Sequence, residues 1–384
     1  MAFSLYVHIP WCRAKCPYCD FNSHVAAAWP EADYTDALIA EMAARATLPA
    51  FAPGKIATVF FGGGTPSLFA PRSIGRILDA ASDRFGIETG AEITLEANPG
   101  TVDLPKLAGY RAAGVNRISF GAQSFNPETL RFLGRIHGPD ETRAAVRAAH
   151  QAGFKRLNLD LIFAVPGQTA ADVVSDLDAA CALAPDHISA YNLTFEEGAA
   201  FFTEMLRGRI RPLPSDDQAA MYAAVREELP RRGYAMYEIS NYAPPGHESR
   251  HNLTYWRAES YLGIGAGAHS FARDLTGPGG HRWWSERMPA KYIAAVQKTG
   301  LAETGAETID ARTAASEFVF LNLRLRAGFD REHFKQRFNC PVEAIFGTEI
   351  ASLTGDGLLD ADDGRIRLTD RGLEMADAVF AEFV

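Results

Sequence analysis

Cysteine is scarce in this sequence: there are five in 384 residues, an odd number, which counts against a disulfide framework. No apolar run approaches the roughly 20 residues that a membrane-spanning helix needs. The start Met1-Ala-Phe-Ser has no positive charge of the kind that opens a secretory signal. Acidic residues outnumber basic ones, and the formal net charge of −9 disfavours general nucleic-acid binding. We therefore expect a cytoplasmic protein with reduced cysteines and no membrane insertion, while peripheral membrane contact stays open.

Three of the few cysteines stand close together, at Cys12, Cys16 and Cys19. Pro17 lies among them and cannot donate the backbone hydrogen bond that a helix interior requires, so we predict a loop. A loop that presents three thiolates is typical of a site for one inorganic centre. An iron–sulfur cluster with one iron left without a protein ligand fits this number of cysteines.

Structural zinc is the alternative interpretation of the same loop. Zinc sites usually close with four protein ligands, often from paired CxxC units. Cys181 and Cys340 stand alone and form no second pair. His8 or His24 could supply a fourth ligand, so zinc stays open on the sequence alone.

Six apolar segments rich in β-branched and aromatic residues alternate with helical patterns along the first half of the chain. These segments are 5–9, 57–61, 92–96, 117–120, 156–163 and 187–191. Such alternation predicts βα units and a parallel sheet, which an open doubly wound sheet or a barrel would satisfy equally. The second segment runs into Gly62-Gly-Gly-Thr-Pro66, a way for a buried strand to bring backbone close to a ligand.

Polar residues gather at or just beyond the ends of these predicted strands. They are Glu96, Gln123, Arg135, Asp160 and Asn192. Folds built from βα units of either type collect their sites at this edge of the sheet. Each residue alone could instead cap the following helix. As a set, we interpret them as the mouth of one site.

The second half of the chain is less regular. We predict a helix over 216–232, a strand over 237–242 and, from about residue 306, helices at 311–326, 330–338 and 342–353. A hairpin around 362–364 and a last helix from Leu373 complete a winged-helix-like pattern. Acidic residues outnumber basic ones in this part, so packing or partner binding is favoured over DNA binding.

A glycine-rich run at 261–270 does not match the dinucleotide fingerprint in context. We expect it to allow close approach of the backbone to a ligand or another strand.

Seven motifs together carry a resemblance to a known family. They are YVHIPWCRAKCPYC, FFGGGTPS, LEANPG, SFGAQSF, LGRIH, LDLIFAVPGQT and HNLTYW. With them the chain resembles the coproporphyrinogen dehydrogenase branch of the radical S-adenosylmethionine (SAM) superfamily, and within it the HemW-type haem chaperones. The resemblance implies an α/β fold, a partial (β/α)6 barrel with a small C-terminal winged-helix-like α+β domain. It implies a radical SAM core at 1–200, a barrel extension at 201–305 and the C-terminal domain at 306–384.

The resemblance also implies two cofactors and the residues that hold them. Cys12, Cys16 and Cys19 would bind a [4Fe-4S] cluster, and SAM would occupy the remaining iron and be split to a 5′-deoxyadenosyl radical. Arg135 would grip the methionyl carboxylate, because a guanidinium binds a carboxylate through two hydrogen bonds. Other implied contacts with the cluster and SAM are Tyr6, Tyr18, Gly63, Gly64, Thr65, Glu96, Gln123 and Asp160.

Three marks separate the branches of this family. Dehydrogenases of the HemN type continue the motif as CxxxCxxCxC after a longer N-terminal extension, whereas Phe21 stands here and the cysteine loop starts at residue 12. The HNxxYW hallmark of the HemW type is present as His251, Asn252, Tyr255 and Trp256. Imidazole is the common axial ligand of haem iron, and aromatic rings stack on the macrocycle. We expect haem to bind there, with His251 as the iron ligand; Cys340 or another histidine stays open as an alternative ligand.

The leading hypothesis is therefore a haem chaperone with a radical SAM cluster that hands haem to acceptor apo-proteins, such as those of the respiratory chain. The alternative is oxygen-independent coproporphyrinogen III dehydrogenase, a radical SAM decarboxylase, whose activity we do not expect here. A zinc-stabilised βα protein without redox chemistry is the third hypothesis.

Overall fold

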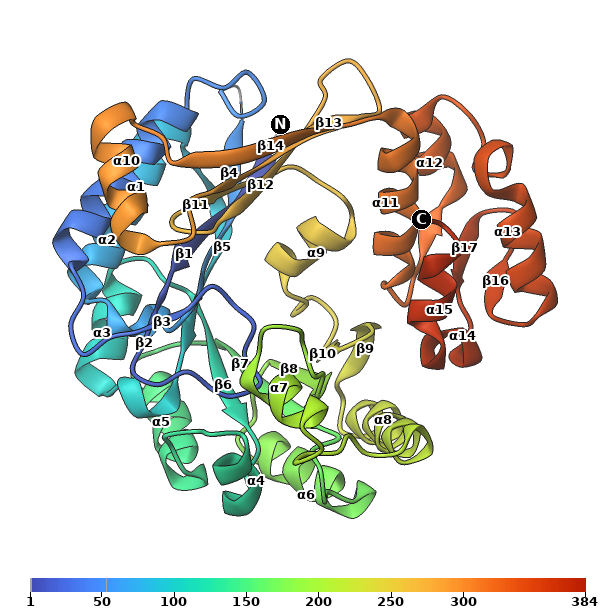
Figure 1. Cartoon of the computed structure of the whole chain (residues 1–384), viewed down its shortest axis with the longest axis horizontal. Coiled ribbons are helices and arrows are strands. Elements are labelled where there is room, and N and C mark those ends of the chain that lie inside the picture. The colour runs from blue at the N-terminus through green and yellow to red at the C-terminus, as the bar shows by residue number, and fades with distance from the viewer. Residues whose placement is uncertain (1, 53) are drawn as a thin grey trace.

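The computed structural model describes residues 2–52 and 54–384, and one curved 12-stranded sheet runs through most of it (Figure 1). Its strands are β1 (Ala2–Ile9), β4 (Lys55–Gly63), β5 (Ile87–Ala97), β6 (Arg117–Gln123), β7 (Arg156–Phe163), β8 (His187–Asn192), β9 (Ala235–Glu238), β10 (Asn241–Ala243), β11 (Tyr261–Ile264), β12 (His269–Arg273), β13 (Gly280–Ser285) and β14 (Glu303–Ile309). The helices around it are α1 (Glu31–Arg45), α2 (Pro71–Phe85), α3 (Leu104–Ala112), α4 (Pro127–Phe132), α5 (Pro139–Gln151), α6 (Ala170–Cys181), α7 (Ala200–Leu206), α8 (Ser215–Arg231), α9 (Arg250–Trp256) and α10 (Pro289–Thr299).

The strand order decides between the two predicted architectures. It runs β14-β13-β12-β11-β1-β4-β5-β6-β7-β8-β10-β9, so the six predicted strands are neighbours in chain order, and all are parallel. A doubly wound sheet would reverse its order at a switch point, whereas a barrel wall adds each strand beside the last. β1 and β8 are not paired with each other, so the barrel is partial. The predicted α/β fold is confirmed.

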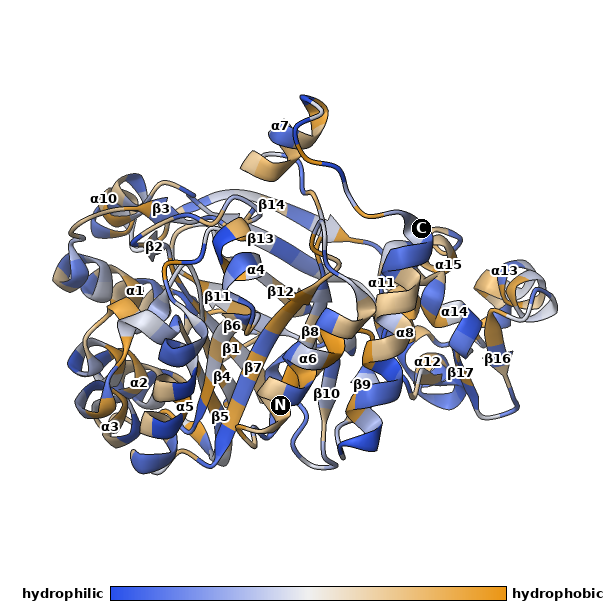
Figure 2. Ribbon diagram, turned by 90° about the horizontal axis from the view of Figure 1, so that it is seen from below, coloured by the Kyte–Doolittle hydropathy of each residue, from blue (hydrophilic) through white to orange (hydrophobic). Residues whose placement is uncertain are grey.

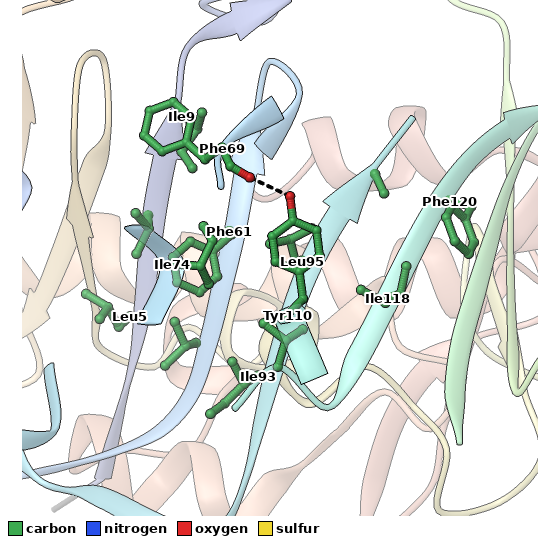
Figure 3. Packing of buried hydrophobic residues seen from close by; sticks show 14 of the residues in the cluster. Leu5, Ile9, Phe61, Phe69, Ile74, Ile93, Leu95, Tyr110, Ile118 and Phe120 are labelled. Carbon is green, nitrogen blue, oxygen red and sulfur yellow. Dashed lines mark hydrogen bonds between the residues drawn. The ribbon is translucent and has the colours of Figure 1, made fainter. Parts of the chain in front are cut away.

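The main hydrophobic core lies between the strands and the outer helices. Figure 3 shows Leu5, Phe61 and Leu95 side by side on successive strands, and each is fully buried. Complete burial of one such side chain contributes about 1.5–3 kcal/mol. Tyr110 of α3 fills the same layer and donates its hydroxyl hydrogen to the carbonyl of Phe69, at 2.6 Å. In Figure 2, β7 ends in an apolar stretch, and the helices around the sheet are of mixed polarity.

α2 shows why the helices cover one face of the sheet. It begins with Pro71 in its first turn, where the missing N–H costs nothing, and stops at Gly86, whose φ is +72°. Ile74, Ile77 and Ala81 recur at helical spacing and are fully buried. The apolar face therefore has to lie on the sheet, and the charged face points to solvent.

Two of the predicted elements are wrong in detail. The segment 237–242 is not one strand but two, β9 and β10, which pair antiparallel with a register shift. Glu238 causes this turn, because its buried carboxylate accepts hydrogen bonds from the Ser240 amide and the Asn241 side chain. The last helix is broken at Met375, whose φ of −114° interrupts the helical backbone. α14 (Asp370–Glu374) and α15 (Ala376–Ala381) replace it.

The C-terminal part forms a module with its own core. Its elements are α11 (Ala311–Leu323), β15 (Phe329–Asp330), α12 (Arg331–Phe338), α13 (Glu343–Gly355), β16 (Leu359–Ala361), β17 (Arg365–Leu368), α14 and α15. Phe318, Phe334 and Phe346 are fully buried in this second core. Figure 1 places the module beside the open edge of the barrel, past α9. None of the helices described is both long and apolar enough to span a membrane.

Candidate functional site

The cysteine motif forms a loop between β2 (Trp11–Cys12) and β3 (His24–Val25), two short parallel strands. Asn22 fixes the loop to the segment that follows β11 and to the one that follows β13. Its side-chain amide donates to the carbonyls of Ala266 and Arg287, both at 2.9 Å. The backbone carbonyl of Asn22 meets Nε2 of His8 at 2.9 Å. The predicted loop conformation is confirmed, and it is held by the body of the protein before any cofactor binds.

Polar side chains contact the sulfur atoms. Thr65 donates its hydroxyl hydrogen to Cys12 Sγ at 3.4 Å, and Arg135 donates Nη1–H to Cys16 Sγ at 3.3 Å. Burial raises the pKa of the thiols of Cys12 and Cys19. Iron binding must therefore displace protons from these two cysteines. Arg135 is thus the cation in direct contact with the cysteine loop.

The zinc alternative can be compared with the donors that the structure brings together. Zinc draws its ligands to one point, and within residues 2–52 and 54–384 no three His, Cys, Asp or Glu side chains are placed to hold a single metal ion. In a [4Fe-4S] cluster each cysteine binds a different iron. Three soft thiols on one loop suit a cluster, and the cluster assignment stays a prediction at this point.

The glycines of 62–64 bring β4 against the cysteine loop. Gly63 has φ +113°, and a Cβ there would lie 2.5 Å from the His8 ring. A Cβ on Gly64 would lie 2.6 Å from the carbonyl oxygen of Trp11. The amides of Gly64 and Thr65 donate to Ile9 and Trp11 carbonyls, both at 2.8 Å. These amides therefore hold the loop, whereas the Gly63 amide donates to the Glu96 carboxylate at 3.3 Å. The contact of this segment with SAM stays a prediction.

Beside the loop, a cavity of about 430 Å³ opens inside the barrel. The predicted site residues that line it are Tyr6, Gly63, Glu96, Asp160, Asn252 and Tyr255. They come from β1, β4, β5, β7 and α9, so the predicted mouth of the βα units and the HNxxYW block face one space.

Two carboxylates make this cavity acidic. Burial raises the pKa of Glu96 to about 8, and the nearby charge of Asp160 adds to the effect. Asp160 accepts hydrogen bonds from Ser119 at 3.0 Å and Asn158 at 2.8 Å, and burial raises its pKa as well. Neither carboxylate forms an ion pair within the described ranges. A cationic ligand with hydroxyl groups would satisfy both.

Three predicted site residues are not among those that line the cavity: Tyr18 belongs to the cysteine loop, Arg135 contacts that loop, and Gln123 lies near Arg135 at Gly121. Arg135 reaches the Tyr18 hydroxyl at 3.5 Å and donates Nη2–H to the Gly121 carbonyl at 2.9 Å. Gln123 has φ +66° at a register shift in β6, an uncommon backbone conformation that recurs at functional sites. Asn192, by contrast, turns away and donates to Gln218 of α8 at 2.8 Å, so its role is structural.

The expectation that His251 faces a ligand is not supported by the structure. Its ring is 1% exposed and lies behind the cavity wall. Thr58 donates its hydroxyl hydrogen to Ser4, so its oxygen accepts Nδ1–H of His251 at 2.7 Å. Nε2 then accepts the Tyr255 hydroxyl hydrogen at 2.9 Å. Both ring nitrogens are used, and burial lowers the pKa of His251 to about 3.

The rest of the HNxxYW block is divided between two places. Asn252 and Tyr255 line the cavity, and Tyr255 packs edge-on against Tyr261 with ring centroids 4.7 Å apart. The guanidinium carbon of Arg324 lies 4.3 Å from the centroid of the Trp256 ring, and this contact joins the barrel to the C-terminal module. Trp256 is therefore an anchor between modules and does not line the cavity.

Several lining residues were missed by the sequence reasoning. They include Arg117, Ser119, Asn158, Ser189, Tyr191 and Tyr261. Most stand two positions apart on one strand, as Ser189 and Tyr191 do on β8, and side chains two apart share a face. Polar residues at alternate positions of otherwise apolar strands were the signal that could have identified them.

Comparisons with known proteins agree with this architecture. Residues 6–180 match the family model described as the radical SAM superfamily, and residues 309–374 match the HemN C-terminal domain. The chain is 35% identical to the heme chaperone HemW of Lactococcus lactis, covering 99% of this chain and 97% of that one. It is 44% identical to the heme chaperone HemW of Escherichia coli over 69% of each chain.

A eukaryotic relative and a solved structure extend the comparison. Mouse radical S-adenosyl methionine domain-containing protein 1, mitochondrial, is 33% identical over 98% of this chain and 86% of its own. The structure of coproporphyrinogen III oxidase (HemN) from Escherichia coli superposes with a TM-score of 0.84 at 25% identity, covering 100% of this chain and 90% of that one.

Proposed function

The chain belongs to the HemW family of the radical SAM superfamily, and on this premise we propose that it is a haem chaperone that carries a [4Fe-4S] cluster and delivers haem to acceptor apo-proteins. The observation that carries the proposal is the juxtaposition of the cysteine loop with a cavity lined by Asn252 and Tyr255 of the HNxxYW block. The cluster, SAM and haem would thus bind next to one another, at the cavity beside the cysteine loop.

Cys12, Cys16 and Cys19 would hold the cluster, and Arg135 would serve both cofactors. Its guanidinium already lies 3.3 Å from Cys16 Sγ, and its buried Nε has no partner within the described ranges. A buried cation with unused donor capacity fits a carboxylate arriving beside the cluster. Tyr18 would keep the guanidinium in place through its hydroxyl.

SAM would occupy the acidic part of the cavity and supply a one-electron cleavage to methionine and a 5′-deoxyadenosyl radical. Glu96 and Asp160 fit its ammonium group and ribose hydroxyls, because both are buried carboxylates that line the cavity, and Arg117 is near enough to act on both without forming an ion pair with either. A bound cation would lower the pKa of Glu96 again. Gln123, with its left-handed backbone, would present its amide at the rim.

Oxygen-independent coproporphyrinogen III dehydrogenation is the second candidate, favoured by the 0.84 TM-score to the Escherichia coli HemN structure. Phe21 counts against this dehydrogenase activity. This side chain is 61% exposed and lies at the cavity opening, at the position where the dehydrogenase motif continues with cysteine. A phenylalanine there supplies an apolar contact for a flat ring system and no sulfur chemistry.

One experiment separates the two candidates. The full chain is reconstituted anaerobically with iron and sulfide, then tested in parallel for haem binding, haem transfer to an apo-haem protein, and conversion of coproporphyrinogen III with SAM and a reductant. We expect haem binding and transfer without porphyrinogen turnover. Catalytic formation of protoporphyrinogen IX, with no stable haem complex, would replace the chaperone proposal by the dehydrogenase.

A further inference from the structure

Two histidines line the cavity, His8 and His269, and they differ in what their rings do. Nδ1 of His8 meets the Tyr6 hydroxyl at 3.0 Å, and Nε2 meets the Asn22 carbonyl. His269 is exposed, and its side chain forms no hydrogen bond to any part of the chain that the structure describes. With His251 also fully bonded, His269 is the cavity imidazole with free nitrogens.

The register of the sheet fixes the direction of the His269 side chain. Phe271 of β12 is paired with Tyr261 of β11, and Tyr261 lines the cavity. Side chains two positions apart in a strand share a face, so His269 is on the cavity face. It stands at the first position of β12, next to the cysteine loop that Asn22 ties to Ala266.

An aromatic platform supports this ring. His269 is the cross-strand partner of Trp284, and the two rings are stacked at 5.8 Å with 27° between their planes. Trp284 is in turn paired with Gly305, where a Cβ would lie 2.3 Å from the indole. The indole therefore lies flat across β14, because the glycine leaves room for it. The paired positions of β12 and β13 thus place the exposed imidazole of His269 beside the flat, partly exposed indole of Trp284.

One cation near the platform is left without a carboxylate partner among the described residues. Burial, followed by the charges of Arg282 and Arg287, lowers the pKa of His269, so the ring is neutral, as a metal ligand must be. Arg282 is already paired with Glu307 at 2.8 Å and Glu317 at 2.6 Å. The Arg287 side chain is exposed and takes part in no ion pair within the described ranges. It is free to meet a carboxylate.

We propose that His269 is the axial ligand of the haem iron, that Trp284 holds its ring in place, and that Arg287 receives a propionate. This assignment rests on the proposed haem-carrying function and replaces His251 as the iron ligand. His251 instead positions Tyr255 at the cavity wall through its hydrogen bond. Haem would then be held at the cavity, where both His269 and Phe21 are lining residues.

The test is a titration of the reconstituted full chain with haemin, followed by Soret absorbance and by electron paramagnetic resonance of the ferric iron. His269→Ala should abolish the ligand-dependent Soret shift and weaken haem binding at least tenfold, while iron content and far-ultraviolet circular dichroism stay unchanged. His269→Gly with added imidazole should recover the wild-type spectrum. His281→Ala is the matched control, because His281 is a neighbouring exposed histidine on the opposite face of β13.

The outcomes are separable. Wild-type haem binding with an unchanged spectrum in His269→Ala overturns the assignment and leaves the chaperone function intact. A spectral change confined to His251→Ala does the same. A wild-type chain that binds no haemin overturns the proposed function and the assignment with it.

Discussion

Gly63 offers a direct test of how the cysteine loop is held. A methyl group at this position would lie 2.5 Å from Cε1 of the His8 ring. That ring cannot move away freely, because both its nitrogens are hydrogen-bonded, to Tyr6 and to Asn22. Asn22 in turn fixes the cysteine loop. Gly63→Ala should therefore either displace His8 or shift β4, and in both cases disturb the cluster site.

The magnitude follows from two additive costs. A non-glycine residue at φ +113° costs about 1–3 kcal/mol in backbone strain. Forcing a methyl group into a packed site costs about another 1–3 kcal/mol. Gly153→Ala isolates the first cost, because Gly153 has φ +86° and a Cβ there meets nothing within 4 Å. The free energy of unfolding should therefore fall by about 2–6 kcal/mol in Gly63→Ala and by about 1–3 kcal/mol in Gly153→Ala.

Urea denaturation of both variants, with iron analysis after reconstitution, measures the difference. We expect a lower midpoint and a lower iron content for Gly63→Ala than for Gly153→Ala. Equal midpoints, together with full iron content in both, would refute the steric reasoning and show that His8 yields at no cost.

Three further predictions follow from the site. Cys16→Ala should lose the iron chromophore after anaerobic reconstitution, whereas Cys181→Ala, on α6 far from the loop, should keep it; the reverse pattern would contradict the cluster assignment. Arg135→Ala should weaken SAM binding by about 2–5 kcal/mol in calorimetry while the iron content is retained, and an unchanged affinity would remove Arg135 from the SAM site. Burial raises the pKa of Glu96 to about 8, so between its ordinary pKa and about pH 8 the folded chain holds a proton that the unfolded chain has lost. The free energy of unfolding should therefore fall as the pH rises through this range. Glu96→Gln should flatten that fall, by up to about 1.4 kcal/mol per pH unit; a parallel pH profile would show that another group causes it.

The sequence predicted the parallel strands well, because each is a short apolar run bounded by a helical pattern and needs no distant partner to be recognised. It did not predict that β11 pairs parallel to β1, or that β12 to β14 extend the sheet beyond it. The first pairing joins residues as far apart in sequence as Ser4 and Tyr261, and nothing local marks it. The glycines of 261–270 did mark a close approach, as expected. Gly265 would collide with the His8 carbonyl and Gly267 with Asn22 if either carried a Cβ.

His251 shows where a motif stops being informative about chemistry. The sequence placed an imidazole beside a tyrosine and a tryptophan, and that composition fits a haem ligand as well as a packed junction. Which of the two it is depends on Thr58, which lies on β4 and takes the Nδ1 hydrogen only once the sheet has formed. His269 is the opposite case. In the sequence it only ends a glycine-rich run, and the pairing of β12 with β13 brings it to Trp284. A ligand is defined by unused bonding capacity that faces a cavity, and in this chain contacts between separate elements, α9 with β4 and β12 with β13, decide which imidazole keeps that capacity.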